Sequence, residues 1–369
     1  MSSRQQYLSI EGHQLIAPSQ RNTRHWLLFT IIVAVVCTWI YAPALRGLPI
    51  WDDNEALFNY PLIASPFSTL GRVWFSHQAP DFWPLHYSWF WLAYRWWGTS
   101  PLPYHLTNLV LHVTTTLLWA AILNRLKVRH AWACALIFAV HPVNTEAVAW
   151  IVQFKTLASS VLGLGSLYLY LIYLDRGAKT QRDHARSILY SVSVALFAAS
   201  LLTKSAVIFL PVVILTVTIW RQRDWKTSIL KCLPFFALAV ACGLAALLWY
   251  KPDQILPPGE HLDLGPMYLR FARAGWNFWF YLRQAFWPDT ITFIYPRQTL
   301  DPTSALTYAP LAAAIALAAF TWVTRKRWGI GLSAALGYYV LALAPVLGLY
   351  GIYFMRYADV ADHWQYLAL

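Results

Sequence analysis

The sequence predicts an all-α, polytopic membrane protein with about nine spanning helices. Hydrophobic residues make up 58% of the 369 residues and charged residues only 12%, whereas soluble domains carry about 25% charged residues. Apolar runs of spanning length recur along the chain, with polar segments between them. The net charge is +12, but Lys and Arg gather in short loops between apolar runs, which indicates membrane topology. We therefore expect contact with membrane lipid and no nucleic-acid partner.

Nine apolar runs define the expected spanning helices in chain order. They are Trp26 to Ala44, Tyr104 to Leu123, Ala131 to Ile151, Leu157 to Leu174, Ser187 to Leu202, Ser205 to Trp220, Cys232 to Tyr250, Ala305 to Val323 and Gly329 to Tyr350. Ala42-Pro43-Ala44 resembles a signal-peptide cleavage site, but a long polar tail precedes this first run, which exceeds a typical signal core. His141-Pro142 predicts a helix break in the third run, because proline frees a carbonyl that His141 or Asn144 can compensate. Lys204 separates the fifth and sixth runs in a turn too tight to be a loop.

Basic segments predict the topology. They are the N-terminal tail and the loops at residues 125–129, 176–186, 221–226 and 325–327, on every second connection. The positive-inside rule places all five on the cytoplasmic side. This arrangement requires that the aromatic runs Pro84 to Trp97 and Arg270 to Trp287 do not span, so we expect interfacial or re-entrant helices there.

Two regions follow from this topology. Residues 1–25 form a cytoplasmic tail, and residues 26–369 form one membrane domain. The outer side receives two large loops, at about 45–103 and 251–304, and the tail after Gly351. The chain stops at the start of another apolar run, so we expect a truncated sequence.

Residues suited to catalysis gather on the expected outer side. Asp52, Asp53 and Glu55 directly follow the first apolar run. Adjacent carboxylates raise each other's pKa, and carboxylates beside a membrane are costly unless they are solvated, paired or used. Cations expected on the same side include Lys204, Arg297 and Arg356. This layout suits a membrane-borne anionic substrate held by cations while a carboxylate removes a proton.

Structural interpretations stand beside these chemical ones. Asp52 and Asp53 can cap a short helix that begins at Asn54, with Glu55 in its first turn. His105, Asn108 and His112 share one helical face, at spacings i, i+3 and i+7. Such a stripe can hold a metal ion, but it more often forms hydrogen bonds with a neighbouring helix.

Six motifs, in order, resemble one known family. They are Trp51-Asp52-Asp53-Asn54-Glu55-Ala56; Tyr104-His105-Leu106-Thr107-Asn108-Leu109-Val110-Leu111-His112; Phe138-Ala139-Val140-His141-Pro142-Val143-Asn144-Thr145-Glu146-Ala147-Val148; Leu202-Thr203-Lys204-Ser205; Trp287-Pro288 followed by Tyr295-Pro296-Arg297; and Ala361-Asp362-His363-Trp364-Gln365-Tyr366-Leu367. Together they resemble the membrane domain of the transmembrane and tetratricopeptide-repeat O-mannosyltransferases and their bacterial relatives, within the GT-C glycosyltransferases. In this family, tetratricopeptide repeats are expected after the membrane domain.

The resemblance implies a GT-C-like helical bundle that transfers a sugar, mannose in the family, from a polyprenyl-phosphate-linked donor. The acceptor is a hydroxyl of a protein Ser or Thr or of a glycan, on the extracytoplasmic face. Asp52 or Asp53 is the implied base, with inversion at the anomeric carbon. The cations implied to bind the donor phosphate are Lys204, Arg297 and Arg356. Supporting residues are Glu55, His105, Asn108, His141, Glu146, Asp362 and His363.

This chain departs from the family pattern at three places. Trp83-Pro84-Leu85-His86 stands where many animal relatives have Arg-Pro-Leu, and Lys204-Ser205 where they often have Lys-Glu. Gln153-Phe154-Lys155 replaces a Gly-Arg-Ala-type segment. The identity of the sugar and the need for a divalent cation such as Mg or Mn therefore stay open.

Two other functional classes are consistent with a polytopic chain. A lipid-linked glycan transporter or flippase would use outer charges as a gate, but transporters tend to place polar groups near the midplane of the membrane. A noncatalytic scaffold would leave the acidic pair dispensable. The placement of charge in outer loops rather than within helices favours the transferase.

Overall fold

The structure is a computed structural model that describes residues 20–64, 70–76, 78–79, 81–176, 184–222, 224–249 and 264–369, with side chains from residue 23 onward. Within these ranges every regular element is a helix, as the sequence predicts. Residues 1–19, which include most of the expected cytoplasmic tail, lie outside the described part.

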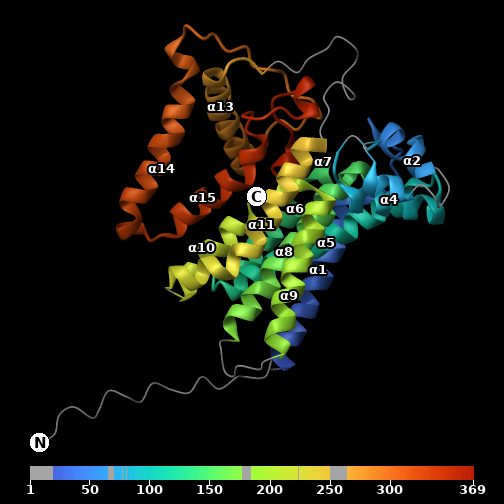
Figure 1. The fold of residues 1–369 in the computed structure, drawn as a ribbon, viewed down its shortest axis with the longest axis horizontal. Coiled ribbons are helices and arrows are strands. Elements are labelled where there is room, and N and C mark those ends of the chain that lie inside the picture. Colours follow the sequence, from blue (N-terminus) through green and yellow to red (C-terminus); the bar gives the residue numbers. More distant parts are fainter. Residues whose placement is uncertain are drawn as a thin grey trace, which may run out of the picture.

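Six of the described helices are long and apolar enough to cross a membrane. They are α1 (Gln20–Leu45), α5 (Pro101–Arg125), α8 (Phe154–Asp175), α9 (His184–Thr203), α10 (Leu210–Gln222) and α11 (Trp225–Trp249), with η3 (Ile151–Gln153) preceding α8 and η4 (Ser205–Val207) preceding α10. They form one bundle (Figure 1). Helix α8 is the most enclosed, since 61% of its apolar window is buried, compared with 17% for α11. Its neighbours include α5 and α9.

The expected third spanning helix is two helices. The run from Ala131 to Ile151 divides into α6 (Ala131–Val140) and α7 (Asn144–Ala149). The predicted break at His141-Pro142 is confirmed, because His141 adopts an extended conformation with φ −68° and ψ 127°. Asn144 Nδ2 donates a hydrogen bond to the carbonyl of Phe138 at 2.7 Å and so compensates for the interrupted helix. A ten-residue helix such as α6 is about 15 Å long, half the hydrocarbon thickness.

The last two expected spans also differ from the prediction. Helix α15 (Gly331–Leu343) ends well before Tyr350, and the turn η6 (Ala344–Val346) that follows contains a proline, which cannot donate a helical hydrogen bond. Helix α14 (Ala309–Trp328) carries three basic residues in its last turn and is not among the six apolar spans. The expected total of nine spanning helices is therefore not confirmed in the described part of the chain.

The helices expected not to span are present. They are α4 (Pro84–Trp97) and α13 (Met267–Phe286). The first outer loop also holds η1 (Asn54–Phe58), α2 (Pro61–Ala64) and α3 (Leu70–Phe75), which lie with α4 at one end of the bundle (Figure 1). Helix α13 packs against α14, and α14 packs against α15. Short turns η5 (Ala305–Thr307), η7 (Tyr353–Arg356) and η8 (Asp362–Trp364) complete the described elements.

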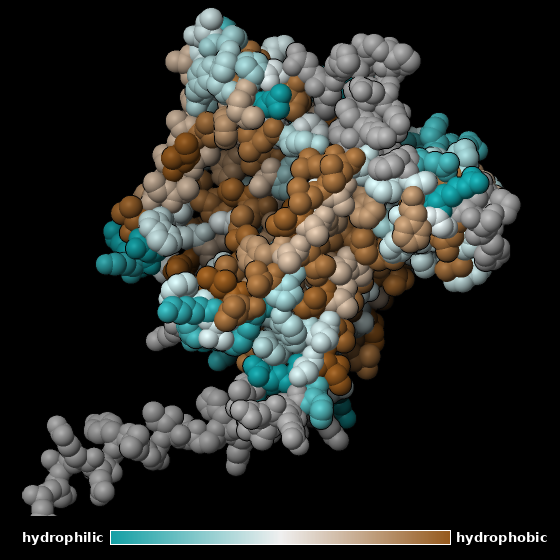
Figure 2. Space-filling view, viewed as in Figure 1, coloured by the Kyte–Doolittle hydropathy of each residue, from teal (hydrophilic) through white to brown (hydrophobic). Residues whose placement is uncertain are grey.

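The two ends of the bundle differ in chemistry. At one end Arg125 and Arg221 both form ion pairs with Asp175, which joins the ends of α5, α8 and α10. The first turns of α1 and α9 lie at this same end, and α4 and α7 lie at the other (Figure 1). Figure 2 shows the apolar flank of the bundle between more hydrophilic ends, as lipid surroundings require. Which end faces the cytoplasm stays a prediction from the positive-inside rule.

Candidate functional site

Asp53 ties the loop that follows α1 to the start of α8. Its side chain is fully buried, and Oδ2 accepts a hydrogen bond from the Ile50 N–H at 3.0 Å while Oδ1 accepts one from the Val152 N–H at 2.9 Å. Burial raises the pKa of Asp53 to about 6, although these hydrogen bonds oppose the rise. Helix η1 begins at Asn54 as expected, but Asp53 forms no side-chain cap on it. Both carboxylate oxygens are therefore occupied by the backbone.

Asp52 lies in different surroundings. Its Oδ1 is buried and has no hydrogen-bond partner among the described residues. Burial raises the pKa of Asp52, while the positive charge of Lys155 and the proximity of His363 lower it. The preceding residue, Trp51, has φ +51°, a left-handed conformation that is uncommon for a residue with a side chain. Glu55 is exposed in the first turn of η1, so Asp52 is the member of the acidic cluster best placed to react.

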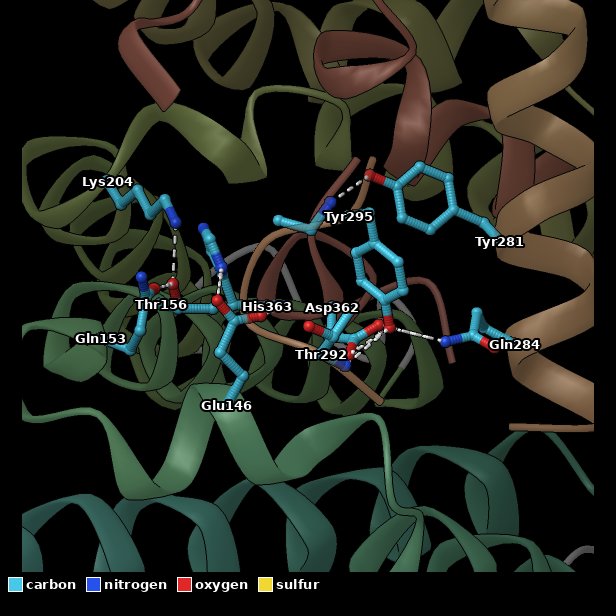
Figure 3. A network of polar contacts seen from close by, with 11 residues as sticks. Glu146, Gln153, Thr156, Lys204, Tyr281, Gln284, Thr292, Tyr295, Asp362 and His363 are labelled. Carbon is cyan, nitrogen blue, oxygen red and sulfur yellow. Dashed lines mark hydrogen bonds and ion pairs between the residues drawn. The ribbon is translucent and has the colours of Figure 1, made fainter. Parts of the chain in front are cut away.

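Glu146 holds His363 through two contacts. Glu146 Oε1 lies 2.8 Å from His363 Nδ1, and Oε2 accepts the His363 backbone N–H at 2.9 Å. An ionised carboxylate only accepts hydrogen bonds, so Nδ1 carries a proton and Nε2 of the neutral ring is an acceptor. Burial lowers the pKa of His363, opposed by Glu146. Figure 3 shows the imidazole between Glu146 and Lys204.

Lys204 reaches this site from the turn between α9 and η4. Its backbone is extended there, and its side chain is only 9% exposed. Nζ donates a hydrogen bond to Thr156 Oγ1 at 2.7 Å, and Thr156 Oγ1 donates one to Gln153 Oε1 at 2.6 Å (Figure 3). Burial and then the positive charge of Lys155 lower the pKa of Lys204 to about 7, while Asp81 and Glu146 raise it. Lys204 is thus a buried side chain within electrostatic range of Asp81 and Glu146.

Three neighbours of this site are residues to which the sequence prediction assigned no role. Lys155, in the first turn of α8, lies with Nζ 5.2 Å from the centre of the Trp83 ring. Asp81 has its pKa raised by burial and lowered by Lys155 and Lys204. His86 is 2% exposed, and its Nδ1 has no hydrogen-bond partner among the described residues. A lysine at the start of an apolar run was the available signal for Lys155.

Arg297 lies in a separate ionic cluster. Its Nε is 3.8 Å from Asp359 Oδ1, and Arg273 Nε is 3.6 Å from Asp359 Oδ2. The expectation that Arg297 joins Lys204 at a phosphate is therefore not supported, because Arg297 faces Asp359, a carboxylate that it shares with Arg273.

Arg356 lies near the acidic cluster through aromatic contacts. Its guanidinium is 5.5 Å from the centre of the Tyr357 ring, and that ring is 5.0 Å from the Trp51 ring. Trp51 immediately precedes Asp52. These contacts bring the C-terminal segment beside the first outer loop.

Asp362 belongs to a buried polar network. Tyr295 OH donates to Asp362 Oδ2 at 2.9 Å, and Gln284 Nε2 lies 3.5 Å from Oδ1 (Figure 3). Burial raises the pKa of Asp362 to about 7 with a smaller contribution from Glu146, although hydrogen bonds from Tyr295 and Gln284 oppose the rise. The network joins α13 to the segment that carries His363, so Asp362 supports the position of that residue.

The polar stripe on α5 serves packing. Asn108 Nδ2 donates to the carbonyl of Trp150 at 3.0 Å, and His112 lies 3.0 Å from the carbonyl of Ala139 and 2.8 Å from Tyr366 OH. His105 is buried, and neither ring nitrogen has a hydrogen-bond partner in the described part of the chain. The helix-to-helix interpretation of Asn108 and His112 is confirmed.

His141 also joins elements. Its Nε2 lies 3.1 Å from the carbonyl of Ala285 in α13, and its Nδ1 lies 3.4 Å from the Val143 N–H. The break between α6 and α7 is thereby fixed against α13. His141 is thus placed as a structural support for α7, which carries Glu146.

The candidate metal ligands do not fit a metal ion. Asn108 and His112 are engaged with protein atoms. Among the described residues, no three His, Cys, Asp or Glu side chains group closely enough to hold a metal ion.

Comparison with known proteins finds similarity to one set of named relatives. The chain is 27% identical over 169 residues to protein O-mannosyl-transferase F38B6.6 of Caenorhabditis elegans, which is 42% of this chain and 24% of that protein. It is 32% identical over 158 residues to protein O-mannosyl-transferase TMTC1 of Mus musculus, 38% of this chain and 16% of that protein. With protein O-mannosyl-transferase Tmtc1 of Drosophila melanogaster it shares 33% identity over 187 residues, 46% of this chain and 20% of that protein.

These relatives confirm the family resemblance that the six motifs indicate. The matched part of the chain spans about a quarter or less of the length of each of these three relatives. No protein-family model and no solved structure matches the chain.

Proposed function

We propose that this chain is a membrane glycosyltransferase that moves a sugar from a polyprenyl-phosphate-linked donor to a hydroxyl acceptor, with Asp52 as the base. The proposal is supported by the similarity to proteins named protein O-mannosyl-transferases. The observation that carries it is the buried, unpartnered Oδ1 of Asp52, within electrostatic range of Lys155 and His363. By the relatives' names, mannose is the proposed sugar and a protein Ser or Thr the proposed acceptor.

In the proposed reaction Asp52 acts on the acceptor hydroxyl and Lys204 acts on the departing phosphate. Asp52 Oδ1 takes the proton of the acceptor hydroxyl as its oxygen forms a bond to the anomeric carbon. The bond from that carbon to the phosphate oxygen breaks, and the electron pair leaves on the phosphate. A phosphate is already a stable anion, so it needs charge neutralisation more than a proton. The Lys204 ammonium, oriented by Thr156 and Gln153, provides that charge.

Asp53, Glu146 and Asp362 act through other residues in this scheme. Asp53 positions Asp52 by fixing the loop to α8. Glu146 fixes His363 in the state that leaves Nε2 as a hydrogen-bond acceptor for a sugar or acceptor hydroxyl. Asp362 holds the segment that carries His363. They are positioning residues.

The site lies at the end of the bundle opposite the Arg125, Asp175 and Arg221 ion pairs. By the positive-inside rule we assign that site end to the extracytoplasmic face. A transporter or flippase is less favoured, because the relatives are named transferases and the charged groups gather at a bundle end rather than at the midplane.

The test is sugar transfer in proteoliposomes that contain the purified chain, a radiolabelled mannosyl polyprenyl phosphate and a Ser/Thr peptide. We expect Asp52→Asn to reduce the rate by about 10²–10⁴-fold, the usual contribution of a general base, without loss of membrane insertion. Glu55→Gln is the matched control, because that carboxylate is exposed in the same loop. Full activity in Asp52→Asn would refute the role of Asp52 as the base. The absence of sugar transfer by the unmodified chain would refute the proposed function.

A further inference from the structure

Lys155 forms no direct ion pair with a carboxylate in the described part of the chain. Apart from its position over the Trp83 ring, its Nζ forms no hydrogen bond or ion pair with any residue that the structure describes. A second ammonium lies nearby: Lys204 Nζ donates a hydrogen bond to Thr156 Oγ1, in the residue that follows Lys155, and burial and then the charge of Lys155 lower the pKa of Lys204. Two ammonium groups brought together in a partly buried place are costly unless an anion lies between them.

The surrounding carboxylates lie near the two lysines without pairing directly with Lys155. Glu146 gives both oxygens to His363, and Asp53 gives both to the backbone. Asp81 and Asp52 remain within electrostatic range of Lys155, but neither forms an ion pair with it in the structure. The charge of Lys155 is thus available to a ligand.

The neighbouring neutral groups also suit an anion. His86 is buried, its Nδ1 has no hydrogen-bond partner in the described residues, and both lysines lie within electrostatic range of its ring. Lys155 and Thr156 stand in the first turn of the 22-residue helix α8, whose partial positive charge at the N-terminus favours a phosphate.

We propose that Lys155 and Lys204 together bind one phosphate group, with Lys155 making a contact that Arg297, which faces Asp359, does not make. The ligand is a phosphate ester at the membrane surface. Lys155 lies within electrostatic range of both Asp52 and Lys204, so a phosphate held by the two lysines belongs to the same site as that carboxylate. The assignment of this phosphate to the sugar donor rests on the proposed function; the two-lysine site itself does not.

The test measures binding without transfer. The purified chain in nanodiscs is titrated with a fluorescent polyprenyl monophosphate that carries no sugar. We expect Lys155→Gln to weaken its affinity by about tenfold or more, the usual loss for a charge-assisted hydrogen bond, and Lys155→Arg to retain most of it. Lys326→Gln, an exposed lysine at the end of α14, is the matched control and should bind normally.

Competitors identify the source of the phosphate. Displacement of the probe by unlabelled polyprenyl phosphate, but not by phosphatidic acid or inorganic phosphate, supports the donor assignment. Equal displacement by phosphatidic acid overturns that assignment and makes the pair a phospholipid headgroup site. Unchanged affinity in a well-folded Lys155→Gln variant overturns the two-lysine site.

A transfer assay separates this inference from the proposed function. With the rest of the chain unchanged, Lys155→Gln should raise the KM for the donor more than it lowers kcat. Binding that depends on Lys155 in a chain that transfers no sugar would refute the proposed function while supporting the site. Normal binding and a normal KM in Lys155→Gln, with transfer intact, would refute the site alone.

Discussion

The contact between Glu146 and His363 gives the most specific prediction about proton positions. Glu146→Gln keeps the size of the side chain but replaces one acceptor oxygen with an NH₂ donor. If the remaining oxygen keeps the His363 backbone N–H, the new NH₂ faces Nδ1. Nδ1 must then accept a hydrogen bond, so the ring proton moves to Nε2. The atom that faces the site changes from an acceptor to a donor.

The expected magnitude follows from the bonds in the structure. The 2.8 Å contact from His363 Nδ1 to the carboxylate is charge-assisted and buried, and such a bond contributes about 1.5–3 kcal/mol. If that energy determines which ring nitrogen carries the proton, its loss corresponds to a fall of about 10- to 100-fold in the transfer rate, since 1.4 kcal/mol is a factor of ten. Glu146 also raises the pKa of His363, so the variant should hold its imidazole neutral to a lower pH.

The assay combines transfer kinetics with nitrogen NMR of the chain labelled at histidine. In Glu146→Gln we expect the His363 signals to show the proton on Nε2 instead of Nδ1, together with a lower transfer rate. Glu55→Gln, whose carboxylate is exposed in η1, should change neither. Unaltered signals with an unaltered rate would refute the reasoning.

Two further predictions concern the acidic pair and the lysines. Asp53→Ala removes the acceptor of the Ile50 N–H and of the buried Val152 N–H, and the loss at Val152 costs about 1–3 kcal/mol. The variant should unfold at a lower temperature and exchange the Val152 amide faster. Stability equal to that of Glu55→Ala would contradict the role of Asp53 in fixing the loop to α8. The pH profile of kcat/KM should fall on the acid side as Asp52, with its raised pKa, becomes protonated. It should fall on the alkaline side from about pH 7 as Lys204 loses its proton, and a flat rate from pH 7 to 9 would exclude Lys204 as the charge that binds phosphate.

The sequence by itself determined the class of the protein and several local features. Hydropathy and the placement of Lys and Arg depend only on neighbouring residues, so they predict a helical membrane bundle and the helices at Pro84 to Trp97 and near Arg270 to Trp287. The break at His141-Pro142 follows from the chemistry of proline alone. The same local reasoning overestimated the spanning helices, because apolar composition does not reveal where a helix ends inside an apolar run.

Only the tertiary structure decided the roles within the candidate site. Asp52 and Asp53 are adjacent and alike in sequence, yet Val152, 99 residues away, occupies an oxygen of Asp53 and leaves Asp52 Oδ1 unpartnered. His363 meets Glu146 across 217 residues, and Arg297 meets Asp359 rather than the lysines. A buried polar group takes the partner that the packed helices bring within about 3 Å. That choice depends on long-range packing, which hydropathy and motif spacing do not encode.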